Sequence, residues 1–302
     1  MSDVIKDAPL GVRGSLILML KGAVMGAADI VPGVSGGTIA FIFGIYERFI
    51  QALSRADMKA FSLLKRFDIK GLWRHFDGQF LLPIFLGILI SIVTLAKGVS
   101  WMLEHQPVLL WSLFNGLIVF SLPFFIKAIT WHVKTLLMVP LGIAFALAIN
   151  LISGNIHDPN LLQVFLAGTI AISALLLPGI SGAFILVLLG MYEPVVSALK
   201  ALDITVLSVF ASGCLVGMLT TSKLIALCLS RFHDVLIAFL MGVVIGALYR
   251  IWPWKLADSP VSWAAFAANG NDPQYPMSAL FFAIGGGLMF LLQQIDKRRE
   301  AE

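Results

Sequence analysis

Two short segments of the sequence share a pattern of proline, glycine and serine that interrupts a helix. The first reads PGVSGGT from Pro32 to Thr38, and the second reads PGISGAF from Pro178 to Phe184. Proline cannot continue the preceding helix, glycine permits the chain to reverse, and serine is a good N-cap for the helix that follows. The free amides at such a helix start attract anions. Each segment is therefore predicted to bind an anion such as a phosphate.

The residues predicted to bind this anion come from both segments. They are Gly33, Ser35, Gly36, Gly37 and Thr38 in the first segment and Gly179, Ser181 and Gly182 in the second. The alternative is that both segments are only tight turns, in which small residues let two re-entrant helices pack closely. The presence of two copies favours the binding interpretation. Because Ala183 and Phe184 stand opposite Gly37 and Thr38, the second segment is expected to bind more weakly.

Two lysines lie within apolar stretches that follow the segments. Lys97 and Lys223 occupy equivalent positions in these stretches. An ionisable residue inside a membrane span costs about 2.5–3.5 kcal/mol on insertion scales and is usually retained for function. Both ammonium groups are therefore candidates to contact a phosphate. The alternative is that each side chain extends to the membrane interface, since each lies near one end of its stretch.

Three carboxylates are candidates for coupling to a proton or another cation. Asp29 precedes the first segment, and Glu47 and Glu193 recur in a Gly-x-Tyr-Glu unit that follows each segment. A carboxyl group in an apolar site can hold a coupling proton or a cation. For Glu47, which is followed by Arg48, a position in the headgroup zone is the simpler interpretation.

Enzymatic chemistry is not expected from this sequence. Residues 33–37 satisfy the Gly-x-Ser-x-Gly pattern of a serine nucleophile, which needs a general base within hydrogen-bond distance. The histidines fall in loops or at span ends, and none is repeated with the serine. The sequence also has no cluster with metal-ligand spacing and no nucleotide-binding loop. We therefore expect no catalytic residue, no metal and no cofactor.

The elements that must position these residues are membrane helices. Of the 302 residues, 59% are hydrophobic and 13% are charged, and the mean hydropathy is +0.94. The apolar residues fall in blocks of about 18 to 25, the length needed to cross a hydrocarbon core. We predict an all-α integral membrane protein with a single membrane domain over residues 1–302. The net charge of +4 is modest, and no nucleic-acid-binding motif is present.

The two halves of the chain resemble each other in sequence. The two stretches that begin at Pro32 and Pro178 agree at about ten positions, Gly22 aligns with Gly168, and Gly87 aligns with Gly213. The repeats are predicted at residues 11–153 and 158–296. Each consists of a re-entrant helical hairpin and three transmembrane helices. The helices are predicted at about 80–103, 108–129 and 135–152 in repeat one and at about 204–229, 235–251 and 277–295 in repeat two.

Basic residues predict the orientation of the repeats. Residues 54–79 form a basic amphipathic insertion with Arg55, Lys59, Lys65, Arg66, Lys70 and Arg74. The positive-inside rule places this insertion in the cytoplasm, together with both termini. Residues 153–160 contain no Lys or Arg and are expected outside. An odd number of crossings per half then gives the two repeats inverted topologies.

The paired PGVSGG and PGISGA segments, each followed by Gly-x-Tyr-Glu, resemble the family catalogued as domain of unknown function 368. The resemblance covers nearly the whole chain. It implies a PopT-type flippase that returns undecaprenyl phosphate, a polyprenyl phosphate, across the prokaryotic cytoplasmic (inner) membrane for reuse in cell-wall synthesis. Ser35, Ser181, Lys97 and Lys223 would then surround the phosphate headgroup, and membrane lipids would be the other partners.

Two other functions stay open at the level of the sequence. A channel or secondary transporter for a small inorganic anion would also place broken helices near the membrane midplane. A scaffold with re-entrant hairpins and no transported substrate is a third candidate, which the recurring Lys and Glu pairs disfavour. The sequence leaves oligomerisation open.

Overall fold

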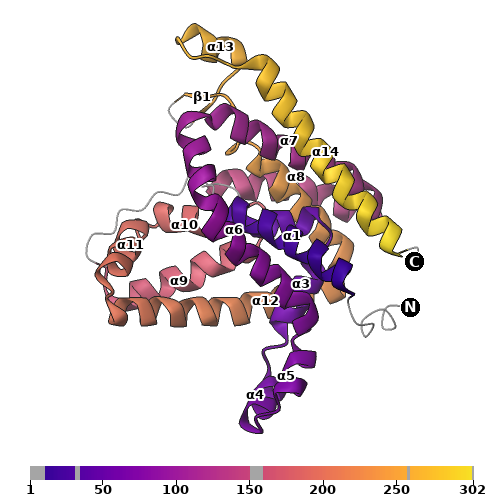
Figure 1. Ribbon diagram of the computed structural model, residues 1–302, viewed down its shortest axis with the longest axis vertical. Coiled ribbons are helices and arrows are strands. Elements are labelled where there is room, and N and C mark those ends of the chain that lie inside the picture. Colours follow the sequence, from indigo (N-terminus) through magenta and orange to yellow (C-terminus); the bar gives the residue numbers. More distant parts are fainter. Residues whose placement is uncertain (1–10, 31–34, 150–158, 257–258, 301–302) are drawn as a thin grey trace.

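The computed structural model describes residues 11–30, 35–149, 159–256 and 259–300, and it is built mainly of helices (Figure 1). The helices before residue 150 are α1 (Val12–Ile30), α2 (Gly36–Ile42), α3 (Tyr46–Ser54), α4 (Met58–Lys65), α5 (Ile69–His75), α6 (Gly78–His105), α7 (Pro107–Ala128) and α8 (Val133–Ile149). Those after it are α9 (Leu161–Leu176), α10 (Gly182–Leu188), α11 (Tyr192–Ala201), α12 (Ile204–Ala247), α13 (Trp263–Ala268) and α14 (Tyr275–Glu300). Two strands, β1 (Lys255–Leu256) and β2 (Ser259–Pro260), pair antiparallel between α12 and α13.

Several of these helices are long and apolar enough to cross a membrane. In the described part of the chain, three helices meet this condition, namely α6, α7 and α12. The pair α10 and α11 is bent by 112° and together forms either a broken span or a re-entrant loop. Shorter apolar helices are α8, α9 and the part of α14 from Tyr275 to Leu291. The predicted class of an all-α integral membrane protein is confirmed.

The predicted spans agree with the helices, with one difference in α12. Two separate spans were predicted at 204–229 and 235–251, whereas α12 runs from Ile204 to Ala247 without a connecting loop. Its backbone leaves the helical conformation at Phe232, where φ is −138° and ψ is 42°. The two predicted spans are therefore joined at a kink. The end of the predicted span at 135–152 lies outside the described residues.

Glycines set the distance between the helices. Gly22 of α1 lies against the backbone of Ile84 in α6, and a Cβ at Gly87 of α6 would meet the carbonyl oxygen of Met19. Gly168 of α9 lies in the same way against the backbone of α12. Small residues permit this close approach. The resulting van der Waals packing stabilises the helix contacts in lipid, where no hydrophobic driving force acts between helices. These glycines include positions that the sequence alignment paired.

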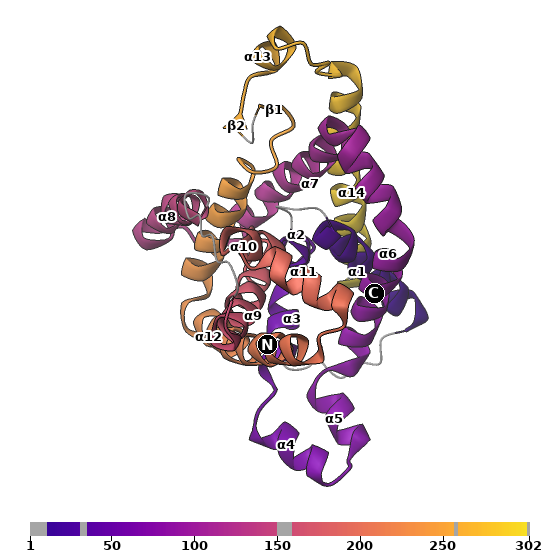
Figure 2. The ribbon, with the colours of Figure 1, turned by 90° about the vertical axis from the view of Figure 1, so that its left-hand side faces the viewer.

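The last helix of each half packs on a helix of the other half. Gly142 of α8 contacts the backbone of Phe239 in α12, and Gly285 of α14 contacts the backbone of Leu113 in α7. Figure 2 shows α8 beside α12 at one edge of the molecule, and α14 packs along α7. Because of this exchange, neither half buries its helices alone.

The contact at Gly285 gives a first prediction. Gly285→Ala is expected to lower the free energy of unfolding by about 1–3 kcal/mol, because the added methyl group must push α14 away from α7. Unfolding of the purified protein in detergent measures this change. The matched control is Gly287→Ala, two residues away on the same helix, where a Cβ would meet nothing within 4 Å. Equal destabilisation by both substitutions would contradict the packing argument.

Two small substructures extend from opposite ends of the molecule. Figures 1 and 2 show α4 and α5 at one end and α13 with β1 and β2 at the other. The short strands and α13 were not predicted from the sequence. The predicted insertion at 54–79 forms α4 and α5, and Arg48 of α3 pairs with Asp77 at its base, with 2.7 Å between Nε and Oδ2.

Candidate functional site

The two interrupted segments lie against each other. We call Ser35–Thr38 the first tip and the stretch from Leu177 to Ser181 the second tip. The hydroxyl of Ser35 donates to the carbonyl oxygen of Leu175 at 3.2 Å, and the hydroxyl of Tyr46 donates to that of Leu176 at 3.0 Å. The amide of Gly179 donates to Thr38 Oγ1 at 2.7 Å. The hydroxyls of Ser35 and Tyr46 thus satisfy carbonyl groups at the C-terminal end of α9.

The Gly-x-Tyr units form the same turn in both hairpins. Gly44 and Gly190 each have φ of 68°. The amide after each glycine donates back to the preceding helix, from Ile45 to Ala40 at 3.0 Å and from Met191 to Leu186 at 2.8 Å. This is the Schellman arrangement, which ends a helix at a left-handed glycine. It reverses the chain after the seven-residue helices α2 and α10.

The amides of the first tip are satisfied by Asp29 of α1 and by Ser35. The amide of Gly36 donates to Asp29 Oδ1 at 2.6 Å, that of Gly37 donates to Ser35 Oγ at 3.1 Å, and that of Thr38 donates to the Ser35 carbonyl oxygen at 2.9 Å. The serine is therefore an N-cap, as predicted. Asp29 occupies the position at which an incoming anion would meet the helix start. Gly33 lies outside the described residues.

The second tip borders a pocket that is partly open to solvent. The pocket is small, with a cavity volume of about 20 Å³, and is lined by Ala146, Ile149, Gly179, Ile180, Ser181, Phe184, Ala247 and Arg250. The guanidinium of Arg250 lies over the ring of Phe184, 4.4 Å from the ring centre. The hydroxyl of Ser181 accepts from the Phe184 amide only at 3.4 Å. The pocket thus combines one cation and one weakly engaged hydroxyl with apolar walls.

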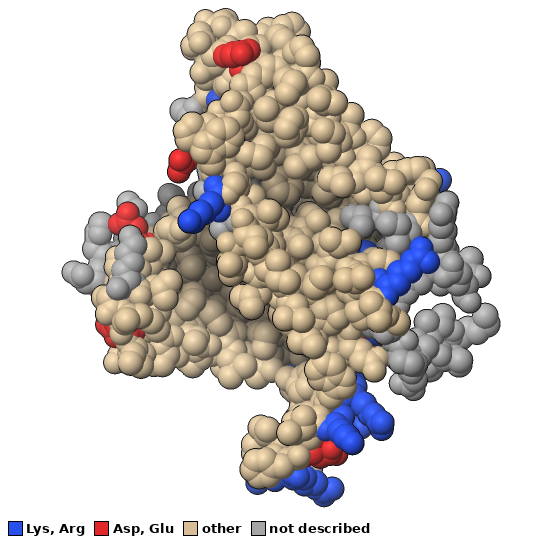
Figure 3. All heavy atoms as spheres, viewed as in Figure 1, with Lys and Arg blue, Asp and Glu red and all other residues tan. Residues whose placement is uncertain are grey.

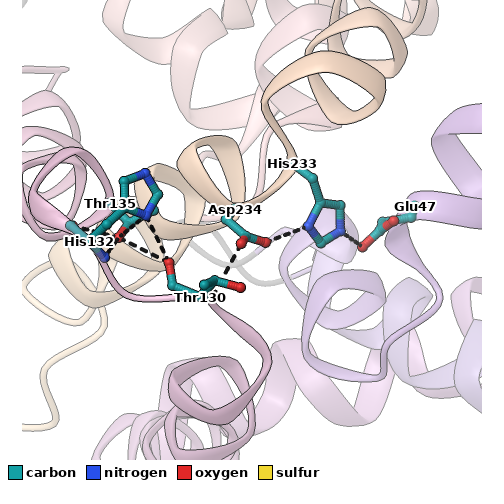
Figure 4. A network of polar contacts seen from close by, with 6 residues as sticks. All are labelled: Glu47, Thr130, His132, Thr135, His233 and Asp234. Carbon is teal, nitrogen blue, oxygen red and sulfur yellow. Dashed lines mark hydrogen bonds and ion pairs between the residues drawn. The ribbon is translucent and has the colours of Figure 1, made fainter.

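Glu47 belongs to a polar network away from the tips (Figure 4). Its carboxylate contacts His233 Nε2 at 2.9 Å, and His233 Nδ1 contacts Asp234 Oδ1 at 2.9 Å. Asp234 also accepts from the amide of Thr130 at 3.2 Å. The network joins α3, the kink in α12 and the turn between α7 and α8. The hydrogen bond to Asp234 has the largest effect and raises the pKa of His233 above its ordinary value. Burial opposes it, and the contact with Glu47 adds to the rise.

Comparison with known proteins shows the family of the chain. A family model described as VCA0040-like, undecaprenyl phosphate translocase-like, matches residues 25–265. The chain belongs to this family. Its relatives include a polyprenyl-phosphate transporter of Vibrio cholerae serotype O1 (strain ATCC 39315 / El Tor Inaba N16961), 42% identical over 259 residues, which are 85% of this chain and 82% of the relative.

A second relative comes from another bacterium. The polyprenyl-phosphate transporter of Staphylococcus aureus (strain NCTC 8325 / PS 47) is 32% identical over 266 residues, which are 82% of this chain and 89% of the relative. No solved structure matches the chain. The VCA0040-like family membership therefore rests on sequence over most of the chain.

The other predicted site residues do not gather at the tips. Lys97 of α6, Lys223 of α12 and Glu193 of α11 are exposed, and none of them forms a hydrogen bond or ion pair with a described residue. Within the described ranges, no group of three or more His, Cys, Asp or Glu residues could hold a metal ion. The role of the two lysines at the headgroup remains a prediction.

Sequence reasoning missed Arg250 and His233. Arg250 stands at the end of the predicted span at 235–251, so its charge at a span end was the one available signal. His233 was seen only as a histidine at a span end. Its two carboxylate partners come from other positions in the sequence, which a pattern search along one helix does not bring together.

The His233 network predicts a pH dependence of stability. Because folding raises the pKa of His233 above its ordinary 6.5, the network stabilises the fold fully below that pH and loses its contribution as pH rises through the raised pKa. The melting temperature in detergent is expected to fall over this window. In the His233→Gln variant this fall in melting temperature should disappear. His105→Gln is the control, since the polar and ring contacts of His105 with described residues are to Trp101 alone. An unchanged fall in melting temperature in His233→Gln would contradict the assignment.

Proposed function

We propose that this chain transports a polyprenyl phosphate, specifically undecaprenyl phosphate, across the membrane that its apolar helices span. Two relatives are polyprenyl-phosphate transporters. The observation that supports the proposal best is the pocket at the second tip, in which Arg250, Ser181 and apolar side chains meet. A lipid monophosphate needs such a combination, because its headgroup is charged and its tail is not.

The headgroup would bind at the second tip. A guanidinium presents a planar fork of donors that matches two phosphate oxygens. Arg250 would supply this fork, and the Ser181 hydroxyl would add a further hydrogen bond. The pocket wall formed by Ala146 and Ile149 of α8 would contact the start of the tail. The outer face of α8 exposes Leu136, Leu137 and Leu141, so the remaining tail would lie in lipid.

The first tip would hold the second one instead of binding substrate. Asp29 at its helix start would repel a phosphate, so we propose an asymmetric site with the stronger anion binding at the second tip. This reverses the expectation drawn from Ala183 and Phe184. The residues of the first tip would then act through the contacts Ser35–Leu175, Thr38–Gly179 and Tyr46–Leu176.

The two halves would have inverted topologies, and the site would alternate between the leaflets by movement of one half against the other. Two contacts support the sidedness. Glu47 in the first hairpin and His233 between the predicted spans at 204–229 and 235–251 would both lie at the cytoplasmic side, and they are 2.9 Å apart. Gln106 between the predicted spans at 80–103 and 108–129 and Gln274 just before the span at 277–295 would both lie outside, and they are 3.0 Å apart. α1 begins and α14 ends on the same side of the molecule (Figure 1), in line with two cytoplasmic termini.

We further propose that the membrane is the prokaryotic cytoplasmic membrane and that transport returns the lipid carrier for cell-wall synthesis without converting it chemically. The test measures undecaprenyl phosphate at the surface of cells depleted of the protein and then rescued with the wild type. Depletion should enlarge the surface pool, and rescue should restore it. If the pool stays unchanged while vesicles containing the purified chain pass a small inorganic anion, the proposal is wrong and the anion-channel alternative replaces it.

A further inference from the structure

The α4–α5 hairpin exposes apolar side chains that no described residue covers. α4 buries only Ala60, and α5 buries none of its residues. Met58, Phe67 and Ile69 are 80%, 86% and 75% exposed. Helices of eight and seven residues are marginal in water without a covered apolar face. The hairpin therefore has the composition of an element that is stabilised by contact with a membrane surface or with another molecule.

The same hairpin contains a basic pocket. It is lined by Arg55, Lys59, Leu63, Gly71, Arg74 and His75. Its backbone is fixed by reciprocal contacts, in which Arg55 Nη1 donates to the His75 carbonyl oxygen at 3.0 Å and His75 Nε2 lies 2.9 Å from the Arg55 carbonyl oxygen. The pocket thus has a defined shape, and its cations converge from α4, α5 and the loop before α4.

The carboxylates near this pocket are already engaged. Asp57 accepts from the amides of Lys59 and Ala60 and contacts His75 Nε2 at 3.1 Å, and Asp68 accepts from the amide of Gly71 at 2.8 Å. The side chains of Lys59 and Arg74 form no ion pair with a described residue. The pocket therefore presents positive charge that the chain itself does not neutralise.

The hairpin stands at one end of the molecule. Figure 3 shows Lys and Arg side chains gathered there, while the broad surface above it is mostly uncharged. The pair Arg48–Asp77 and the ring contact of Arg48 with Phe80, at 4.4 Å from the ring centre, hold its base to the membrane domain. Exposed apolar residues beside unneutralised cations match the interface of a membrane that contains anionic lipids.

We propose that the α4–α5 hairpin lies on the adjacent leaflet, with Met58, Phe67 and Ile69 among the lipid chains and the phosphate headgroup of an anionic phospholipid in the pocket between Lys59 and Arg74. The hairpin is then a lipid-binding site separate from the transport pocket. It would hold the first hairpin, through α3 and Arg48, at a fixed depth in the membrane.

The test uses the full chain, one copy per lipid nanodisc, with Cys214 and Cys228 replaced by alanine and a fluorophore on Ser62→Cys. Nitroxide-labelled phosphatidylglycerol is compared with nitroxide-labelled phosphatidylcholine as a quencher. We expect quenching to favour phosphatidylglycerol about fivefold, the ratio that one basic residue near an anionic surface provides. Lys59→Gln with Arg74→Gln should bring this ratio close to one.

The matched control is Arg66→Gln with Lys70→Gln, which removes the same charge from the same hairpin outside the pocket. It should leave most of the preference. Equal loss in both double variants, or no preference in the wild type, would overturn the proposal. So would quenching that requires two copies per disc, which indicates a contact between chains, or a preference shown by nitroxide-labelled polyprenyl phosphate but not by phosphatidylglycerol.

Discussion

Arg250→Gln is expected to reduce polyprenyl-phosphate transport by about ten- to 150-fold. A hydrogen bond to a charged group contributes about 1.5–3 kcal/mol, and each 1.4 kcal/mol corresponds to about tenfold in affinity. The guanidinium is the cation in the pocket with Gly179 and Ser181, so glutamine leaves the phosphate without a counter-charge. Uptake of labelled polyprenyl phosphate across vesicles that contain the purified variant measures the loss.

Two controls separate substrate binding from folding. Arg250→Lys retains the charge without the planar fork and should keep an intermediate rate. Arg231→Gln removes an exposed arginine from α12, away from the pocket, and should leave transport unchanged. The ring contact with Phe184 contributes about 0.5–1 kcal/mol, so Arg250→Gln should still fold. Full transport by folded Arg250→Gln would show that the headgroup binds elsewhere.

The local features of the hairpins could be predicted from the sequence because their causes are local. Ser35 and Ser181 cap the helices that follow them. Gly44 and Gly190, noted in the sequence only as part of a repeated Gly-x-Tyr-Glu unit, end those helices with the same left-handed turn. Each feature depends on residues within one helical turn, where hydrogen-bond geometry and permitted backbone conformations decide the outcome. The apolar blocks predicted the membrane helices for the same reason, since span length is a property of a continuous stretch.

Which residues line the site depends on contacts between segments that are far apart in the sequence, and the sequence did not predict these residues. Asp29 lies seven residues before Gly36 and caps α2, so it satisfies an amide that was expected to bind the anion. Arg250 reaches the second tip only because α12 ends beside it. For Lys97, repeat equivalence gave a position along the helix but not the face on which the side chain lies. The exposed position of this lysine follows from how α6 packs.

Thr38→Val is expected to lower the free energy of unfolding by about 1–3 kcal/mol and to impair transport, because it leaves the half-buried amide of Gly179 without a partner. The Gly179 amide donates to Thr38 Oγ1 at 2.7 Å, and Thr38 is 2% exposed. Valine has nearly the same shape, so the change removes the acceptor and little else. Unfolding in detergent and transport in vesicles measure the two effects.

The hydroxyl and not the side-chain volume should decide the result. Thr38→Ser keeps the acceptor and should retain most stability and transport. Thr220→Val removes a hydroxyl that bonds only to carbonyl oxygens of its own helix, α12, and should change little. If Thr38→Val transports like the wild type, the two tips do not need this hydrogen bond to hold the site. A loss in Thr38→Val with recovery in Thr38→Ser would mean that the first tip acts on the second through the amide of Gly179, since the Thr38 hydroxyl accepts from it.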